Sequence, residues 1–496
     1  MQKISYICQK SFFVQRKFII NLGLLLLLNF LIKPFWIFGI DRTVQNTIPT
    51  ADYGTYFALF NFSLLFNILL DLGITNYNNR NIAQNHHLLT KYFSGIVVFK
   101  CLLAIVYLGT TFMVGAIMGY DSNRFYILLF LSINQFLISF IQYLRSNIAG
   151  LQLFMLDSLF SVLDKTLMII FCSILLWGHF IQVEFNLMQF IYGQTLAYLI
   201  AAIVLFITVY AKTKKLTFKV NLPFLLLILK QTAPYALLVL TMTFYYRLDV
   251  IMLDYMLPDG EIQAAIYAQA YRLMDASNQM GVLFAGLLLP MFAYMIKDKK
   301  KLDKLVKLSF TLLFIPAIVL ALLCFAYSSE IMNGLYGENT AASSGVLPVL
   351  MFCFVAIAST YIFGTLLTAN GNLKQLNILA ICGMSLNLIL NIILIPTFKA
   401  FGSAIASLIT QFLMVLIQVF LAKKIFNFYV NYRFVVAILG YVLLLVGAIY
   451  LMQKNDIQLV SGAVVFVSFA VVLGIVLRVI KPKEMISLLM NRGVEE

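Results

Sequence analysis

The chain has 496 residues, of which 62% are hydrophobic and only 11% are charged. Soluble domains contain about 45–50% apolar and about 25% charged residues, so this composition excludes a water-soluble globular protein. The formal net charge is +15, but the Lys and Arg residues gather in loops between apolar runs. That distribution is typical of a membrane protein and argues against a nucleic-acid-binding protein.

Apolar runs of about 20 residues recur along the chain, and each is long enough to cross about 30 Å of hydrocarbon. We therefore predict an all-α polytopic membrane protein with about 14 transmembrane helices. The predicted helices cover residues 18–40, 54–73, 92–118, 123–147, 153–177, 185–210, 223–254, 261–294, 305–327, 343–368, 375–396, 401–425, 431–452 and 457–480.

The loops between these helices differ in charge and so predict the orientation of the chain. The stretches 212–219, 297–307 and 423–433 are basic, whereas the intervening loops carry acidic residues such as Asp259. Cytoplasmic loops of membrane proteins carry an excess of Lys and Arg, and an even number of helices then places both termini in the cytoplasm. The first apolar run reaches about Ile40, too long for a cleavable signal, so we expect it to stay as an anchor.

The residue types that bind metals or form disulfides show no clustered pattern. The six cysteines are scattered, and no C-x-x-C pair occurs. His86 and His87 are adjacent, which is poor geometry for chelation from one helix face. We therefore expect no metal site, no cofactor and no disulfide framework.

Three pairs of similar segments indicate an internal repeat. The pairs are DYGTYFAL (52–59) with AAIYAQA (264–270), NIAGLQLF (147–154) with TANGNLKQL (368–376), and YGQTLAYLIAAIVLF (192–206) with SLITQFLMVLIQVF (407–420). Members of a pair lie six predicted helices apart and so have the same orientation, as in parallel repeats. We predict two six-helix lobes, 1–211 and 212–425, followed by two additional helices and a cytoplasmic tail in 426–496.

Charged residues inside predicted helices identify candidate site residues. A charge at the bilayer centre costs roughly 2.5–3.5 kcal/mol, so such residues face the bundle interior or a wet cavity. Arg247 and Asp249 point about 200° apart on one helix and cannot neutralise each other. In the next helix, Arg272 and Asp275 lie one turn apart. Both arginines are about 17 Å from the turn between the helices, which is roughly the midplane. We predict that one carboxylate balances one arginine and that the other arginine faces an anionic ligand.

The N-terminal lobe adds further intramembrane charges. Asp164 and Lys165 lie near the middle of the fifth predicted helix, Lys33 in the outer half of the first, and Lys100 in the third. With the arginines, these lysines predict a net cationic midplane. Two alternatives stay open: Lys33, Lys100 and Arg145 can reach the headgroups with their long side chains, and the carboxylates and arginines can form structural ion pairs.

Four segments carry a family resemblance: DYGTYFALFNFSLLFNILLDLGI (52–74), YRLDVIML (246–253), IYAQAYRLMD (266–275) and FGSAIASLITQF (401–412). With them the chain resembles bacterial polysaccharide (O-antigen type) flippases of the multidrug/oligosaccharidyl-lipid/polysaccharide exporter superfamily. The resemblance implies two six-helix lobes around a central cavity that opens alternately to either side. By position it assigns Arg247, Arg272 and, more loosely, Lys33 to the diphosphate, whereas Lys100 and Lys165 are assigned from burial alone.

The resemblance implies a flippase that moves a polyprenyl-pyrophosphate-linked oligosaccharide across the bacterial inner membrane for surface polysaccharide biosynthesis. Neutral polar residues, Asn61, Asn67 and Asn278, are expected to hold the sugar. Coupling to a proton or sodium gradient is a further hypothesis, with Asp249, Asp275 or Asp164 as carrier or charge balance. We expect a monomer that contacts membrane lipids, a polysaccharide polymerase and glycosyltransferases, but not nucleic acid.

Two other functions compete with this interpretation, and a lipid scramblase, for which no residue is diagnostic, is a third alternative. An ion-coupled multidrug exporter on the same fold favours an acidic cavity for cationic drugs, whereas this midplane is basic. An enzyme such as a polysaccharide polymerase needs carboxylates or a large outer loop, but the predicted outer loops are short and no paired acids occur at catalytic spacing. We therefore predict a transporter and not an enzyme.

Overall fold

The computed structural model describes residues 23–24, 27–85, 87–178, 185–213, 222–296, 298–428 and 431–480. These residues form helices and connecting turns, and none of them lies in a β-strand. Eleven of the described helices are long and apolar enough to cross a membrane. The predicted all-helical membrane fold is confirmed, whereas the count of about 14 helices stays a prediction. The predicted cytoplasmic termini fall within residues 1–22 and 481–496, outside the described residues.

The chain divides into two compact units, Met1–Asp254 and Tyr255–Glu496. The helices of the first unit are η1 (Trp36–Asp41), α2 (Arg42–Thr47), α3 (Thr50–Leu65), η2 (Asn67–Leu70), α4 (Ile74–Gln84), α5 (Leu88–Ile117), α6 (Ser122–Gly150), α7 (Phe154–Trp177), α8 (Leu187–Tyr210) and α9 (Leu222–Met256), whose last two residues belong to the second unit. The lobes inferred from the repeat, 1–211 and 212–425, stay a prediction.

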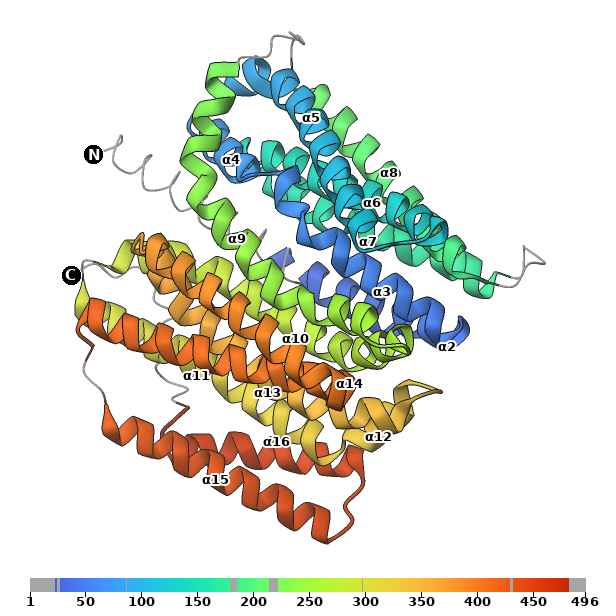
Figure 1. Ribbon diagram of the computed structural model, residues 1–496. Coiled ribbons are helices and arrows are strands. Elements are labelled where there is room, and N and C mark those ends of the chain that lie inside the picture. Colours follow the sequence, from blue (N-terminus) through green and yellow to red (C-terminus); the bar gives the residue numbers. More distant parts are fainter. Residues whose placement is uncertain are drawn as a thin grey trace. The chain divides into compact units, whose positions relative to one another are not determined.

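The second unit contains α10 (Gly260–Met295), α11 (Lys299–Ala326), α12 (Ser328–Leu335), α13 (Thr340–Ala369), α14 (Leu373–Phe426), α15 (Tyr432–Lys454) and α16 (Leu459–Val476). Within this unit α13 packs against α10, α11 and α14, and α15 lies beside α16 (Figure 1). Most of these bounds agree with the predicted helices to within a few residues, because the apolar runs set the helix lengths.

The second predicted helix, 54–73, differs from the structure. The helix ends at Leu65, passes through the short 3-10 turn of η2, and resumes as α4. Leu72 and Gly73, with φ of 47° and 83°, take the left-handed conformation and separate the two halves. The sequence missed α4 because ITNYNNRNIAQ is polar and does not register as an apolar run.

The predicted helices 375–396 and 401–425 are the two arms of α14. Lys399 is non-helical, with φ 53° and ψ −134°, and marks the bend between them. A Cβ placed on Gly402 would lie 2.8 Å from the carbonyl carbon of Leu394, although residues eight apart in a straight helix are about 12 Å apart. The chain therefore reverses sharply at Lys399, and a side chain at position 402 would prevent this close approach.

One predicted repeat pair, NIAGLQLF (147–154) and TANGNLKQL (368–376), adopts the same local structure twice. After α6, the amides of residues 151, 152 and 153 donate to the carbonyls of 147, 149 and 148; after α13, those of 370, 371 and 372 donate to 366, 368 and 367. The residue that reverses the chain is left-handed in both turns: Gln152 has φ 61° and Gly371 has φ 80°. The sequence similarity of this pair therefore reflects one turn built twice.

Candidate functional site

Arg247 lies on α9 within the apolar span Ala236–Met256, and its side chain is half-buried. Its Nη1 donates to Oδ1 of Asn61 on α3 at 3.2 Å. Asn61 is 1% exposed and donates from Nδ2 to the carbonyl oxygen of Phe57 at 2.7 Å, which turns its own oxygen toward the guanidinium. The amide that was expected to hold sugar therefore orients an arginine. Asp249, two residues further along α9, is almost completely buried.

Apolar side chains pack this part of α9 against α3 and α6 of the same unit. Ile251 is buried in a cluster with Phe62 and Leu65 of α3 and Leu128 of α6, and Phe244 packs against the same cluster. The segment of α9 that carries Arg247 and Asp249 is therefore held beside α3 and α6.

A buried ion pair anchors the end of the same segment. The Arg124 guanidinium, at the start of α6, donates from Nη1 and Nη2 to the two carboxylate oxygens of Asp254 at 2.5 and 3.1 Å. The Asp254 side chain is 2% exposed, and the guanidinium also lies over the Tyr120 ring, 5.5 Å from its centroid. Such fork-shaped pairs are directional and strong. Neither charged residue was predicted as a site residue.

Lys165 lies on α7 between two aromatic rings. Its Nζ donates to the Tyr198 hydroxyl at 2.8 Å and lies 5.0 Å from the Tyr198 ring centroid and 5.7 Å from that of Trp36. Asp164, the adjacent predicted residue, is 3.6 Å away. One turn earlier, Ser161 accepts a hydrogen bond from Asn29 at 2.9 Å, which ties the first helix to α7. The Lys165 ammonium therefore lies near a carboxylate, a tyrosine hydroxyl and two aromatic rings.

A buried carboxylate that the prediction missed lies at the end of η1. Asp41 is 1% exposed and accepts hydrogen bonds from the Tyr53 hydroxyl at 3.0 and 3.1 Å and from Gln45 Nε2 at 3.0 Å. It escaped prediction because it lies just beyond the apolar run that ends at Ile40. Its signal in the sequence is weak, since acidic residues are common at helix ends.

Lys100, on α5, is surrounded by oxygen atoms. Its side chain is 1% exposed, and Nζ donates to Asp71 Oδ1 at 2.8 Å, to Ser139 Oγ at 2.9 Å and to the carbonyl oxygen of Leu70 at 3.1 Å. Asp71 could have been found from the sequence, because it is the one acidic residue inside the apolar run 54–73. Binding of diphosphate by Lys100 stays a prediction, and it would require Nζ to leave these oxygens.

Two further basic residues in the first unit were singled out by the sequence. Arg145 Nε donates to Asp157 Oδ1 at 2.9 Å and links α6 to α7, so it forms an ion pair near the helix ends. Lys33 is half-buried in the helical stretch that leads into η1. Asn67, expected to contact sugar, donates to Gln135 Oε1 at 3.0 Å.

In the second unit the predicted residues lie along α10. Arg272 and Asp275 are both half-buried, one turn apart. Asn278, three residues further on, accepts a hydrogen bond from the Tyr361 hydroxyl of α13 at 2.8 Å. Tyr361 lies so close to α10 that a Cβ on Gly281 would be 2.6 Å from its ring. The predicted pairing of charges between α9 and α10 stays a prediction.

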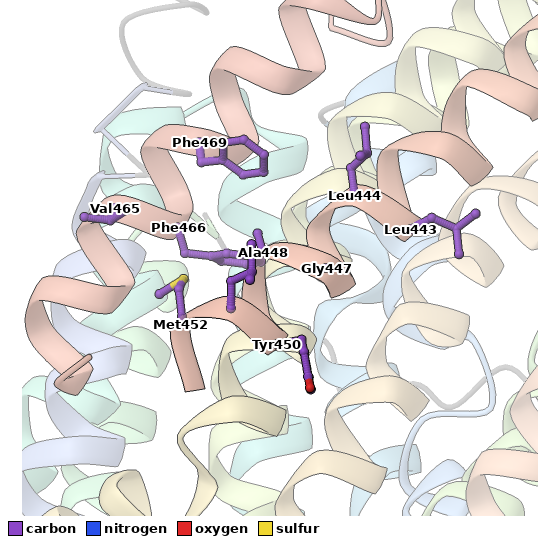
Figure 2. Close-up of a pocket in the computed structure, with 10 residues that line it drawn as sticks. Leu443, Leu444, Gly447, Ala448, Tyr450, Met452, Val465, Phe466 and Phe469 are labelled. Carbon is purple, nitrogen blue, oxygen red and sulfur yellow. The ribbon is translucent and has the colours of Figure 1, made fainter. Parts of the chain in front are cut away.

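The helices α15 and α16 line an open apolar hollow of about 590 Å³. Figure 2 shows Leu444, Gly447 and Met452 of α15 and Phe466 and Phe469 of α16 around it. Its lining offers hydrocarbon contacts and lacks charged side chains, so it suits an apolar chain and not a diphosphate.

Several described basic residues of the first unit lie inside apolar spans. Lys100 and Arg145 pair with Asp71 and Asp157, and the Lys165 ammonium and the Arg247 guanidinium are half-buried. Such groups attract anions, and the guanidinium can make two parallel hydrogen bonds to one phosphate. Among the residues that the structure describes, no three His, Cys, Asp or Glu side chains come close enough to hold a metal ion.

Comparison with known protein families shows to which family the chain belongs. Residues 21–296 match the model of the family described as "Polysaccharide biosynthesis protein". The chain belongs to this family. A curated relative, an uncharacterized membrane protein of Methanocaldococcus jannaschii, is 27% identical over 203 residues, which cover 39% of this chain and 40% of that protein. The chain thus matches about two fifths of the length of this curated relative.

Solved structures of other proteins share the fold of this chain. It is similar to the lipid II flippase MurJ in an inward closed conformation, with a TM-score of 0.60 and 14% identity over 86% of this chain and 98% of that one. It is also similar to an outward-facing multidrug resistance MATE transporter of the MOP superfamily (TM-score 0.59, 15% identity, 82% and 95% covered). A MOP superfamily transporter from Pyrococcus furiosus has a TM-score of 0.56 with 15% identity over 82% of this chain and 94% of that one. At these identities the similarity establishes the fold, that of MOP transporters.

Proposed function

We propose that this protein is a flippase that moves a polyprenyl-pyrophosphate-linked oligosaccharide across the cytoplasmic membrane by alternating access, for surface polysaccharide biosynthesis of the O-antigen type. The observation that carries the proposal is Arg247, a half-buried guanidinium inside an apolar span, oriented by the buried Asn61. Membership of a polysaccharide biosynthesis family and the fold shared with a lipid II flippase support the substrate class.

The chemistry of such a substrate explains why basic side chains are placed inside the membrane. A charged headgroup pays a very large desolvation penalty in hydrocarbon. Arginine compensates with two parallel hydrogen bonds to phosphate, and lysine supplies a compact point charge. We assign the diphosphate to Arg247, Lys165 and Arg272, with Lys33 as a further contact. The protein then acts as a carrier and not as an enzyme, and polymerase and glycosyltransferases are its expected partners.

A multidrug exporter is the second candidate, because the fold is also that of MATE transporters. Cationic drugs favour acidic binding residues, whereas the half-buried Arg247 and Lys165 are basic. Drug susceptibility of a deletion strain separates the two functions: loss of surface polysaccharide with unchanged drug tolerance supports the flippase, and the reverse result supports the exporter.

Replacement of Arg247 tests the proposal directly. We expect Arg247→Ala to reduce surface polysaccharide at least about tenfold, because hydrogen bonds to charged groups contribute about 1.5–3 kcal/mol each. Arg247→Lys should recover only part of this, since an ammonium lacks the fork of donors. The measurement is surface polysaccharide per amount of membrane-inserted protein, with Arg272→Ala in parallel.

Arg433→Ala is the matched control, because Arg433 is exposed at the start of α15. It should leave export unchanged. Wild-type export by both Arg247→Ala and Arg272→Ala at normal protein levels would contradict the proposal.

A further inference from the structure

The second span of the first unit unwinds deep inside the helical bundle. Between α3 and α4 the chain makes only the short turn of η2 before Leu72 and Gly73 reverse into the left-handed region. The facing side chains show its depth: Lys100 is 12 residues from the start of α5, and Ser139 is 11 residues from the end of α6. At about 1.5 Å per residue, the break lies about 17 Å from these helix ends.

Unwinding leaves backbone carbonyls that no helical amide can satisfy, and such carbonyls are costly inside a membrane. Here the carbonyl oxygen of Leu70 accepts from Lys100 Nζ at 3.1 Å and from Ser139 Oγ at 3.2 Å. The ammonium also reaches Asp71 Oδ1 and Ser139 Oγ, with the Ser139 carbonyl at 3.4 Å and the Tyr143 ring centroid at 5.8 Å. Two segments of the chain, Leu70–Asp71 and the part of α6 around Ser139, thus direct their oxygens at one positive centre on α5.

We propose that the oxygen set at this break is a monovalent-cation site that the chain fills with its own Lys100 ammonium. In broken transmembrane helices, unwound carbonyls and carboxylates coordinate cations such as Na⁺. An ammonium group has three donors, and three contacts of Lys100, those to Asp71, Ser139 Oγ and Leu70, are 3.1 Å or shorter. Lys100 is thus a tethered cation that stabilises the unwound segment. This role is independent of the proposed transport function, and it differs from the predicted contact with diphosphate.

The contacts at this site predict the effect of removing the Lys100 side chain. Without Lys100, the Asp71 carboxylate, which is 22% exposed, and the Leu70 carbonyl have no positive partner among the contacts described for them. A largely buried carboxylate that has lost its partner destabilises the fold. A free cation of similar size relieves this cost, and it stabilises the folded state by mass action because the unfolded chain has no such site.

Thermal unfolding of full-length Lys100→Ala, purified in detergent, tests this site. At equal ionic strength we expect its Tm to be below that of the wild type in choline chloride and to rise by at least about 2 °C in ammonium, potassium or sodium chloride. The wild-type Tm should be the same in all four salts. Asp71→Asn combined with Lys100→Met removes both charges and should unfold independently of the cation.

Lys165→Ala is the matched control, since Lys165 is also intramembrane but donates to a tyrosine hydroxyl and lies beside aromatic rings, with the Asp164 carboxylate further away at 3.6 Å. Its Tm should not depend on the cation. A Tm of Lys100→Ala that is equal in choline and in the three small cations would overturn the proposal. The proposal would also be overturned if folded Lys100→Ala could not be purified in any of the salts, because a free cation should rescue its fold. An unstable Asp71→Asn/Lys100→Met double variant would contradict it as well.

Discussion

The Arg124–Asp254 pair shows how burial decides the weight of a single ion pair. The Asp254 side chain is 2% exposed and receives two hydrogen bonds from one guanidinium, whereas Lys301 and Asp298, at 3.5 Å, are largely exposed. Exposed pairs contribute about 0–1 kcal/mol. Breaking a buried pair by removing one partner costs about 3–5 kcal/mol, because the remaining charge has no partner.

We therefore expect Asp254→Asn to lower the free energy of unfolding by about 2–4 kcal/mol, somewhat less than for a pair with both partners buried, because Arg124 is 21% exposed. Asp298→Asn, in the exposed pair, should cost less than about 1 kcal/mol. Thermal unfolding of the purified variants measures both. The double variant Arg124→Gln/Asp254→Asn should cost less than the sum of its single changes, and simple additivity would show that the two residues do not act as a pair.

At the scale of elements, the bend of α14 is held by contacts with the turn between α9 and α10. Lys399 Nζ donates to Asp259 Oδ2 at 2.8 Å, and Gln263 Nε2 donates to the same oxygen at 2.9 Å. The backbone amide of Ala400 reaches Gln263 Oε1 at 3.4 Å. The hydrogen bond from Lys399 lowers the pKa of Asp259 below its usual value. The tip of the α14 hairpin is therefore fastened by a group that titrates in acid.

A lowered pKa in the folded state means that ionised Asp259 stabilises the fold above its unfolded pKa of about 3.9 and that this stabilisation is lost as the pH falls through the folded pKa. The effect should be about 1 kcal/mol or less, because Lys399 is 52% exposed and solvent screens the pair. Unfolding measured between neutral pH and pH 3 should show a smaller acid loss in Asp259→Asn than in the wild type. An identical pH profile would exclude this role.

At the scale of the whole molecule, the division of the chain into two compact units suits the alternating access that we propose. Asp249 is nearly fully buried in a span, where a charged carboxylate is costly and a protonated one is not. In the transport cycle that we propose, this carboxylate would carry a proton or pair with a sodium ion. Asp275 and Asp164 are the other candidates for this role.

We therefore expect transport of lipid-linked oligosaccharide in vesicles to depend on a proton or a sodium gradient. Collapse of the coupling gradient should reduce the rate several-fold, and Asp249→Asn should remove that dependence while leaving the protein inserted. Lys399→Ala, at the exposed tip of α14, is the control variant and should keep the dependence. Transport that continues at the same rate after both gradients are collapsed would refute coupling.

The predicted site residues show where inference from sequence ends. Burial of Lys100 and Lys165 followed from their place in apolar runs, since any such charge must be screened from lipid. Their partners did not follow: Ser139 is 39 residues from Lys100, and Tyr198 is 33 residues from Lys165. The link between Arg247 and Asn61 spans 186 residues. Spacing along one helix says nothing about such contacts.

A helical membrane protein, and the places where most of its helices begin and end, could be predicted from the amino-acid sequence. The physical reason is local: inside hydrocarbon each segment must satisfy its own backbone hydrogen bonds, so apolar length fixes the helix. The break of the second span at Asn67–Gly73, and the meeting of oxygens from two segments at Lys100, are visible only in the folded chain. Those features depend on which distant side chains meet, and burial makes their pairing obligatory without specifying the partner.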